Sequence, residues 1–337
     1  MHRRQFLFTS ATLAGGLTAM SSLPAYGKGL FSPTRPPRLR EGDQVAVITP
    51  GSALSEEDFA KALDNIRSLG LDPVPMTHAN TKYGFLGGTD FQRLSDLHEA
   101  FANPELKGVI CARGGYGTGR IVHNIDYDLI RRNPKVLLGF SDITALLNAI
   151  YQETGLVCLH GPVAASELTH FTRTSLKQTL FEASRVDLRA ADGYTIKGGT
   201  AKGKLVGGNL SLITSLLGTK YEINLRKKIL LIEDVGESPY RVDRMLTQLL
   251  NSSSMQYARG IVFGVFNDCD IDPEDPESAK EFTLKQVLTE RCAMLKMPVY
   301  YGMDTGHVAD NATLPIGLKV EFDADKGILR STEPAVK

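Results

Sequence analysis

The sequence predicts an α/β fold with two domains, of which the first is a mostly parallel sheet covered by helices on both faces. From residue 44 onward, short apolar runs alternate with segments of helical periodicity, and parallel strands need such crossover helices. The chain has 337 residues, 42% of them apolar and 23% charged, which is enough for two separate cores. Its net charge is zero, so no nucleic-acid or anionic-membrane partner is expected.

The first 29 residues have the pattern of an export signal. Arg3 and Arg4 precede the small, apolar and uncharged stretch 9–23, and residues 25–27 offer a cleavage site. The arginine pair predicts the twin-arginine route and a periplasmic protein. Beyond residue 30 no apolar run is long enough to cross a membrane, so we expect no stable membrane span in the mature chain.

Residues 38–165 form the first predicted domain. Ser55 followed by three acidic residues predicts the start of a helix, and Gly70 predicts its end. Apolar, β-branched runs bounded by turn residues predict the strands. The expected strands are 44–49, 72–76, 108–112, 136–138 and 156–159, and the expected helices are 55–70, 90–103 and 143–150.

A polar segment, residues 166–200, predicts a linker that contains one helix at 174–183. Residues 201–330 then predict a smaller α+β domain, with an acidic, proline-interrupted surface loop at 268–277. Its expected strands are 203–206, 228–232, 260–266, 299–301 and 319–322, and its expected helices are 210–217, 240–250 and 281–294.

The four cysteines do not suggest a metal centre. They are widely spaced, with no Cys-x-x-Cys pair and no histidine nearby at ligand spacing, so no zinc site, other metal or cofactor is expected. Cys111 and Cys158 lie in apolar, strand-like runs and are predicted to be small core residues.

The candidate nucleophile is Ser141. The apolar run 136–138 continues into Gly139-Phe-Ser-Asp142, and helical periodicity follows. A serine on a sharp strand-to-helix turn has an accessible hydroxyl, and the N–H groups of the helix start can hold an oxyanion. The alternative is that Ser141 only caps the helix, since serine is a favoured N-cap.

A glycine-rich turn, Arg113-Gly-Gly-Tyr-Gly-Thr-Gly119, follows the strand 108–112. It lacks both the order of a dinucleotide-binding loop and the Lys-[Ser/Thr] of a P-loop. Glycines let backbone N–H groups approach a ligand closely, so Gly114 and Gly115 are candidate oxyanion donors beside the N–H of Asp142. A plain tight turn is the alternative.

A serine nucleophile needs a base, and the base needs an orienting acid. Of the seven histidines, two follow predicted strands: His160, which also fits a structural hydrogen bond, and His307, in a glycine-punctuated loop. The acid candidates stand at the end of the apolar run 229–232, where one-sided desolvation strengthens a carboxylate's attraction for an imidazolium. They are Glu233, predicted to be the first residue after the strand, with Asp234 and Glu237 as alternatives.

Together these segments, with Arg113-Gly-Gly-Tyr-Gly and His160-Gly-Pro, closely resemble the LD-carboxypeptidase family of serine peptidases over roughly residues 38–325. The resemblance implies a catalytic triad of Ser141, Glu233 and His307. It also implies a Rossmann-like N-terminal domain, similar to class I glutamine amidotransferases, and a smaller C-terminal domain that carries the acid and the histidine.

The resemblance further implies cleavage of the L,D-bond before the terminal D-alanine of murein tetrapeptides, which gives tripeptides, and a homodimer. The terminal carboxylate of such a peptide needs a cation, and Arg113 or Arg241 could supply it. Tyr116 and Asn209 are further candidates for substrate binding.

Two features depart from the family's pattern. Asp142-Ile143 stands where the hydrolase motif Gly-x-Ser-x-Gly has its second glycine, so packing at the turn should differ. The relatives best known for murein recycling are cytoplasmic, whereas this chain has an export signal, so its substrate is either a recycled fragment or wall murein.

Two other functions compete with this interpretation. One is the branch of the same family that gives self-immunity by cleaving an aminoacyl-nucleotide antibiotic. The absence of tryptophan and the export signal count against it. The other is a periplasmic binding protein without catalysis, which fits two lobes and export.

Overall fold

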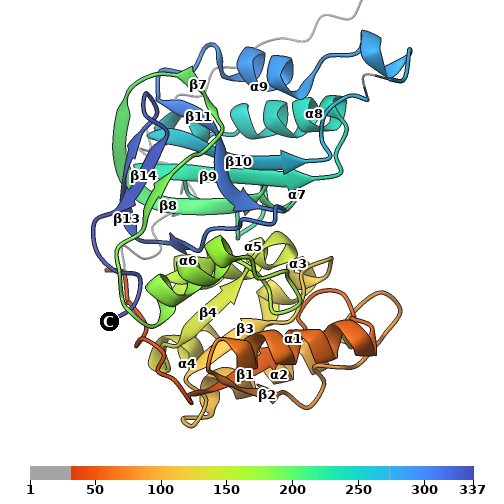
Figure 1. Cartoon of the computed structure of the whole chain (residues 1–337), viewed down its shortest axis with the longest axis vertical. Helices are drawn as coiled ribbons and strands as arrows, with labels where there is room; N and C mark the ends of the chain where they lie inside the picture. The colour runs from red at the N-terminus through yellow and green to blue at the C-terminus, as the bar shows by residue number, and fades with distance from the viewer. Residues whose placement is uncertain (1–31, 273) are drawn as a thin grey trace, which may run out of the picture.

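The computed structural model describes residues 32–272 and 274–337. Within them, a six-stranded and an eight-stranded sheet, each with its own helices, form two lobes, the first below and the second above in Figure 1. The predicted two-domain, mixed α/β architecture is therefore present. The predicted export signal lies outside the described residues.

The sheet of the first lobe is parallel, as the alternation of strands and helices predicted, except for one edge strand. Its order is β12-β5-β4-β3-β1-β2, and only β12 is antiparallel. The chain order changes direction between β1 and β3, where the carboxyl ends of parallel strands typically form a binding crevice. The strands are β1 (Gln44–Ile48), β2 (Asp72–Pro75), β3 (Gly108–Cys111), β4 (Val136–Gly139), β5 (Cys158–His160) and β12 (Leu314–Ile316).

Side-chain caps fix the starts of several helices in this lobe. The Ser55 hydroxyl accepts the N–H of Asp58, as its sequence pattern predicted, and Thr89 and Gln92 form a capping box. The helices are α1 (Glu56–Ser68), α2 (Asp90–Ala102), α3 (Thr118–Ile121), α4 (Tyr127–Arg132), α5 (Thr144–Thr154) and α6 (His170–Leu180), with the 3-10 turns η1 (Val122–Asn124) and η2 (Ser141–Ile143).

Four parallel strands form the centre of the second sheet, whose order is β6-β14-β13-β8-β9-β10-β11-β7. They are β8 (Thr200–Asn209), β9 (Lys228–Val235), β10 (Gly260–Asn267) and β11 (Val299–Gly306). The antiparallel outer strands are β6 (Asp187–Arg189), β7 (Tyr194–Lys197), β13 (Lys319–Asp323) and β14 (Ile328–Ser331). The helices are α7 (Leu210–Ser215), α8 (Pro239–Leu250) and α9 (Leu284–Cys292), with η3 (Met255–Tyr257) and η4 (Ser278–Lys280).

Two connections tie the lobes together more closely than the sequence patterns indicated. The segment 166–200, predicted as a linker, contributes β6 and β7 to the second sheet. Conversely, β12 comes from the C-terminal part of the chain and pairs with β5 of the first sheet. No helix of the described residues is long and apolar enough to cross a membrane.

Three central strands extend further than their apolar runs. β8 continues to Asn209 and β11 to Gly306, and Glu233 lies inside β9, paired with Asn209, rather than being the first residue after the strand. An apolar run marks where a strand is covered by core, whereas backbone pairing continues beyond it. The prediction for Glu233's place on the strand was wrong for this reason.

The helix α5 forms the contact between the lobes, and it is buried on nearly all sides. The Asn148 amide donates to the carbonyl of Gly207 at 2.9 Å and accepts the N–H of the same residue at 3.0 Å. Gly207 and Gly208 of β8 have positive φ angles of 113° and 139°, and a Cβ on Gly208 would lie 2.4 Å from Thr144 Oγ1. Glycine is thus required where β8 meets α5.

We expect Asn148→Ala to lower the free energy of unfolding by about 2 to 3 kcal/mol, because it leaves two buried backbone groups of Gly207 without partners. Urea unfolding followed by circular dichroism measures the loss. The matched control is Asn124→Ala, at an exposed position, with an expected change of about 0.5 kcal/mol or less. Equal losses in the two variants would contradict the assigned role of Asn148.

Candidate active site

Ser141 occupies a strained turn between β4 and α5. Its φ is 61°, in the left-handed region that non-glycine residues seldom adopt. Gly139 makes the turn possible, since a Cβ there would lie 3.0 Å from the side chain of Ile143. Neither η2 nor α5 has a side-chain cap bond at its start, so Ser141 is not a helix cap, and that alternative was wrong.

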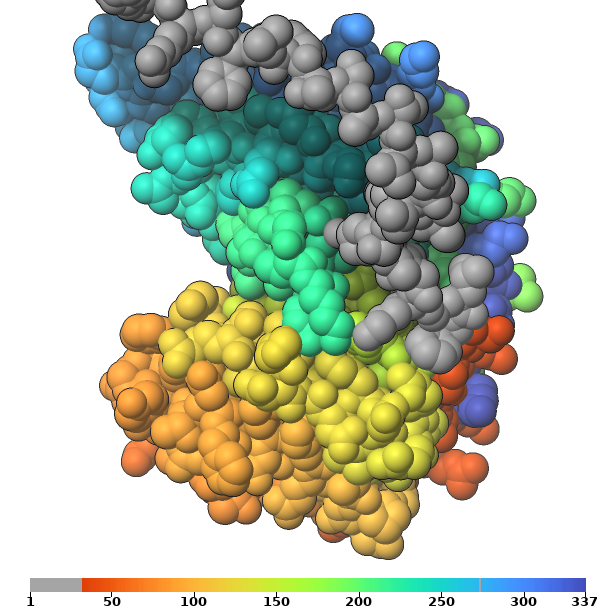
Figure 2. Space-filling model, turned by 180° about the vertical axis from the view of Figure 1, so that it is seen from behind, coloured from red at the N-terminus to blue at the C-terminus, as the bar shows by residue number. Residues whose placement is uncertain are grey.

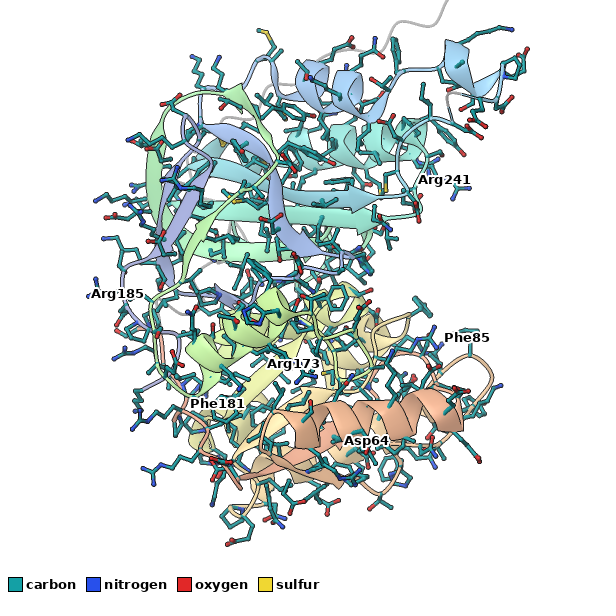
Figure 3. The ribbon with its side chains drawn as sticks, viewed as in Figure 1. Asp64, Phe85, Arg173, Phe181, Arg185 and Arg241 are labelled. Carbon is teal, nitrogen blue, oxygen red and sulfur yellow. The ribbon has the colours of Figure 1, made fainter. Side chains whose placement is uncertain are left out.

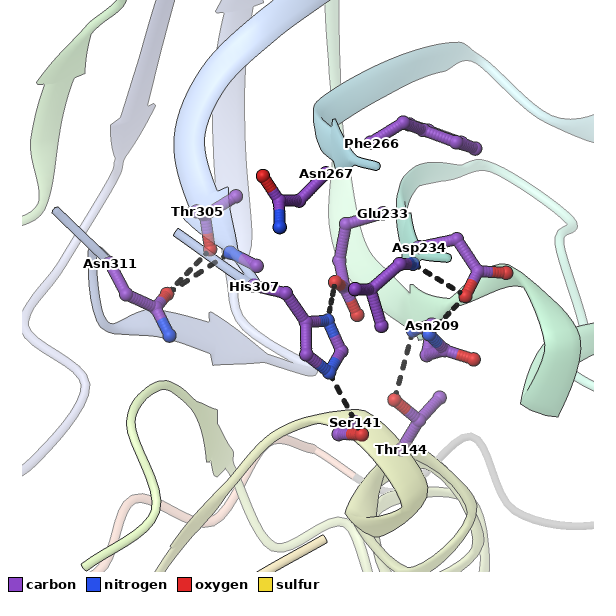
Figure 4. A network of polar contacts seen from close by, with 12 residues as sticks. Ser141, Thr144, Asn209, Glu233, Asp234, Phe266, Asn267, Thr305, His307 and Asn311 are labelled. Carbon is purple, nitrogen blue, oxygen red and sulfur yellow. Dashed lines mark hydrogen bonds and ion pairs between the residues drawn. The ribbon is translucent and has the colours of Figure 1, made fainter. Parts of the chain in front are cut away.

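The structure brings the three predicted triad residues together. His307 Nδ1 lies 2.7 Å from Glu233 Oε2, and His307 Nε2 lies 3.1 Å from Ser141 Oγ (Figure 4). Ser141 belongs to the first lobe, whereas the other two belong to β9 and the end of β11 in the second. The series of hydrogen bonds therefore crosses between the lobes, where the molecular surface is hollowed (Figure 2).

The two alternative acids are engaged elsewhere. Asp234 accepts hydrogen bonds from the Ser211 N–H and hydroxyl at 3.1 and 2.8 Å, at the start of α7. Glu237 lies 3.5 Å from the Arg241 guanidinium, near the start of α8. Only Glu233, of the three, contacts a histidine that contacts Ser141.

The Glu233 carboxylate is fully buried. Burial raises its pKa, but the neighbouring imidazoles of His160 and His307 outweigh this effect and lower the pKa below its usual range. The carboxylate is therefore ionised at neutral pH, when it can accept a hydrogen bond from His307 and attract a positive charge on that ring.

Glu233 and His307 are held by their backbone surroundings. A Cβ on Gly306, whose φ is 111°, would lie 2.7 Å from Glu233 Oε2, so only glycine fits directly before His307. Asn311 accepts the Gly306 N–H at 3.1 Å and fixes the turn. The Phe140 ring packs against the His307 ring, with centroids 4.7 Å apart.

The predicted oxyanion donors are only partly brought together. A Cβ on Gly114 would lie 2.7 Å from Ser141 Cβ and 3.3 Å from the Asp142 nitrogen, so the backbone of Gly114 adjoins the Asp142 amide. Gly115 instead packs against Ser52, with a Cβ position 2.4 Å from its hydroxyl. Of the predicted donors, Gly114 and the Asp142 N–H thus lie beside Ser141, where a tetrahedral intermediate would carry its negative oxygen.

The Asp142 side chain joins the two turns. Its Oδ2 accepts the Thr118 N–H at 2.9 Å, while its carbonyl accepts the Thr118 hydroxyl at 2.5 Å. Burial raises the pKa of this carboxyl. The serine turn and the glycine-rich turn thus form one rigid unit.

The predicted substrate-binding residues lie in different surroundings. Arg113 and Tyr116 are exposed on the glycine-rich turn, where Arg113 donates to the Ala53 carbonyl at 2.9 Å. Arg241 is exposed on the second lobe, on the same side of the molecule as Phe85 of the first (Figure 3). Asn209 is buried, and its amide caps α7 and donates to Asp234 at 2.8 Å, so the structure does not expose it to a substrate.

Three residues that matter for this geometry were not predicted: Phe140, Thr118 and Asn311. Phe140 and Thr118 stand inside the two turns that the sequence singled out, so their place was visible although their contacts were not. Asn311 contacts the site only through folding of the segment after β11, and no local pattern marks it.

The four cysteines are all free and buried, as predicted for Cys111 and Cys158. Burial raises the pKa of each thiol, so none is prepared as a nucleophile.

Comparison with known proteins identifies the family. Residues 45–161 match the model of the LD-carboxypeptidase N-terminal domain, and residues 202–322 match that of the C-terminal domain. The chain is 41% identical over 303 residues to the "Probable murein peptide carboxypeptidase" of Bacillus subtilis, and the match covers 88% of this chain and 94% of the relative. The chain belongs to the LD-carboxypeptidase family.

Solved structures share the two-lobe fold. The muramoyltetrapeptide carboxypeptidase of Oxalobacter formigenes is 28% identical, with a TM-score of 0.76, over 86% of this chain and 97% of that one. The microcin C7 self-immunity protein has a TM-score of 0.80 over 90% of this chain and 100% of its own, at 23% identity. The second likeness is one of fold alone.

Proposed function

We propose that the protein is a serine carboxypeptidase that releases the terminal D-alanine of murein tetrapeptides and leaves tripeptides. The observation that carries the proposal is the series of hydrogen bonds from Glu233 through His307 to Ser141. The names of the relatives, a murein peptide carboxypeptidase and a muramoyltetrapeptide carboxypeptidase, support this substrate class.

In the proposed mechanism, Ser141 Oγ attacks the carbonyl carbon of the L,D-amide while His307 Nε2 takes its proton. Glu233 keeps the Nδ1–H tautomer and stabilises the imidazolium. The Asp142 N–H and the backbone of Gly114 stabilise the oxyanion. His307 then protonates the leaving D-alanine amine, and water hydrolyses the acyl-enzyme with the same histidine as base.

We favour Arg113 over Arg241 as the cation for the terminal carboxylate. Arg113 directly precedes Gly114, which packs against Ser141, whereas Arg241 already has Glu237 as an ion-pair partner at 3.5 Å. A substrate held by Arg113 would present its last peptide bond near the nucleophile.

The finer fold assignment is also part of the proposal. We infer that the first lobe is Rossmann-like and related to class I glutamine amidotransferases. Its strands follow the order 2-1-3-4-5, which is a doubly wound order, and its nucleophile follows β4 at the carboxyl edge.

We expect Ser141→Ala to abolish D-alanine release, because the variant has no nucleophile. Mass spectrometry of purified muropeptides incubated with mature protein measures the reaction, and tetrapeptides but not pentapeptides should lose the mass of one alanine. An unchanged unfolding curve of the variant serves as the control. Release of D-alanine by Ser141→Ala would rule out the proposed triad.

The same variant separates the competing functions. A fluorophosphonate should label the wild-type protein at Ser141 and leave Ser141→Ala unlabelled. A binding protein without catalysis would show no labelling at this serine. The self-immunity function has only a likeness of fold in its favour, and cleavage of an aminoacyl nucleotide in place of muropeptides would support it.

We expect Gly114→Ala to lower kcat/KM at least about 100-fold, because its methyl group would lie 3.0 Å from Ser141 Oγ and displace the oxyanion donors. Gly119→Ala is the matched control five residues further along, at the start of α3, since a Cβ there meets nothing within 4 Å, and it should keep activity within about twofold. If both variants retained wild-type rates, Gly114 would not adjoin the reacting atoms.

We also propose that the protein is exported to the periplasm by the twin-arginine route, on the pattern of residues 1–29. Cell fractionation should find the mature protein in the periplasm, and replacing Arg3 and Arg4 by lysine should retain the precursor in the cytoplasm. Periplasmic protein at wild-type level in that double variant would argue against the route. The homodimer implied by the family resemblance stays a prediction.

A further inference from the structure

A second histidine lies beside the triad and takes no part in the mechanism described so far. His160 is the last residue of β5, paired with Leu314 of β12, and its side chain has no solvent exposure. Its Nε2 lies 3.9 Å from Glu233 Oε1, on the side of the carboxylate away from His307. Glu233 therefore stands between two imidazoles.

The polar atoms on this side of Glu233 are unsatisfied. Neither ring nitrogen of His160 has a hydrogen-bond partner among the described residues, and neither has Glu233 Oε1. Buried polar groups in native proteins are nearly always paired, because an unpaired one loses its hydration without gaining a hydrogen bond. The sequence left open that His160 makes only a structural hydrogen bond, but no such bond is present among the described residues. The burial of this histidine therefore needs another explanation.

The distance between the two groups suggests that explanation. A separation of 3.9 Å is about 1 Å longer than a hydrogen bond and too short for an intervening water. A small rotation of either side chain would bring a His160 N–H within bonding distance of Oε1. No other described residue is recorded as bonding to these two atoms.

The surrounding residues limit other movements. A Cβ on Gly208 would lie 3.2 Å from His160 Cδ2, and one on Gly306 would lie 2.7 Å from Glu233 Oε2, so backbone packs closely on both side chains. The Phe140 ring lies between the histidines, with centroids 6.1 Å from His160 and 4.7 Å from His307. These contacts pack both side chains closely on the sides that face Gly208, Gly306 and Phe140.

We propose that His160 is a positioning residue whose ring N–H bonds to Glu233 Oε1 as His307 becomes charged, and so holds the carboxylate aligned with the imidazolium. His160 does not touch the substrate, and no proton passes to Glu233. This inference rests on the proposed function, because it gives His160 a role in the same reaction. The ionisable groups that act on this carboxylate are His160 and His307, with Asp234 beside it in β9.

The test compares His160→Leu with His160→Gln in the mature protein. Leucine removes the donor at similar volume, whereas the Gln amide nitrogen can replace Nε2. We expect His160→Leu to lower kcat about 10- to 100-fold, the effect of one hydrogen bond to a charged group, with KM changed less than about twofold. His160→Gln should keep kcat within about fivefold of wild type.

The pH profile distinguishes positioning from mere packing. Because the His160 bond forms as His307 becomes charged, its loss destabilises the imidazolium, so the acidic limb of kcat/KM should move to lower pH in His160→Leu. It should stay in place in His160→Gln. His123→Leu, the same replacement at an exposed histidine, should change neither kcat nor the limb.

Several outcomes would overturn the inference. One is a wild-type kcat and pH limb in His160→Leu, and another is an equal loss in the Gln and Leu variants. If His160→Leu does not fold, His160→Asn replaces it, since its shorter amide cannot reach Oε1 and should behave as predicted for Leu. A wild-type protein that neither cleaves muropeptides nor reacts with fluorophosphonate would overturn the proposed function itself, whereas an active enzyme indifferent to His160 would overturn this inference alone.

Discussion

The buried carboxylate of Glu233 is the group around which the site and much of the second lobe are arranged. An ionised carboxylate without solvent contact is stable only if positive or polar groups compensate its lost hydration. Here the compensation comes from the hydrogen bond to His307 of the second lobe and, at 3.9 Å, from the nearby imidazole of His160 of the first. Because these rings lie on β5 and after β11, the carboxylate favours only the docked arrangement of the two sheets. The glycine at 306 follows from the same constraint, since any side chain would occupy the carboxylate's space.

The division of the site between the lobes has a physical advantage. The first lobe supplies the proposed nucleophile, Ser141, on a strained turn beside Gly114, and the Asp142–Thr118 bonds join this turn to the glycine-rich turn. The second supplies the proposed acid–base pair, with Glu233 on β9 and His307 directly after β11. Each half is rigid by itself, so their alignment depends on the contact of α5 with β8, where Asn148 and a pair of positive-φ glycines permit close approach.

Local sequence patterns predicted the helices, the strands and the candidate catalytic residues. They did not predict contacts between segments that lie far apart in the chain. Ser141 was recognisable because strand, turn and helix follow one another within a few residues. The use of Asn209 as a helix cap, the place of Glu233 within β9 and the return of β12 to the first sheet depend on pairing between distant segments. Nor could periodicity decide between Glu233 and Asp234, since neighbours on a strand point to opposite faces and either face could have met the histidine.

That alternation of faces also explains how the neighbouring residues Glu233 and Asp234 contact different parts of the molecule. Glu233 points toward His307 and the first lobe, while Asp234 points to the opposite side and accepts the Ser211 N–H and hydroxyl, near the start of α7, together with the Asn209 amide. Each carboxylate therefore accepts hydrogen bonds from a different set of partners. Burial raises the pKa of Asp234, its hydrogen bonds oppose this effect, and the nearby charge of Glu233 adds a smaller increase. A shift of β9 by one residue would turn Asp234 to the face that Glu233 now occupies, and the Ser211 N–H of α7 would lose Asp234 as its acceptor. The cap of α7 thus helps to fix the register that presents Glu233 to the histidine.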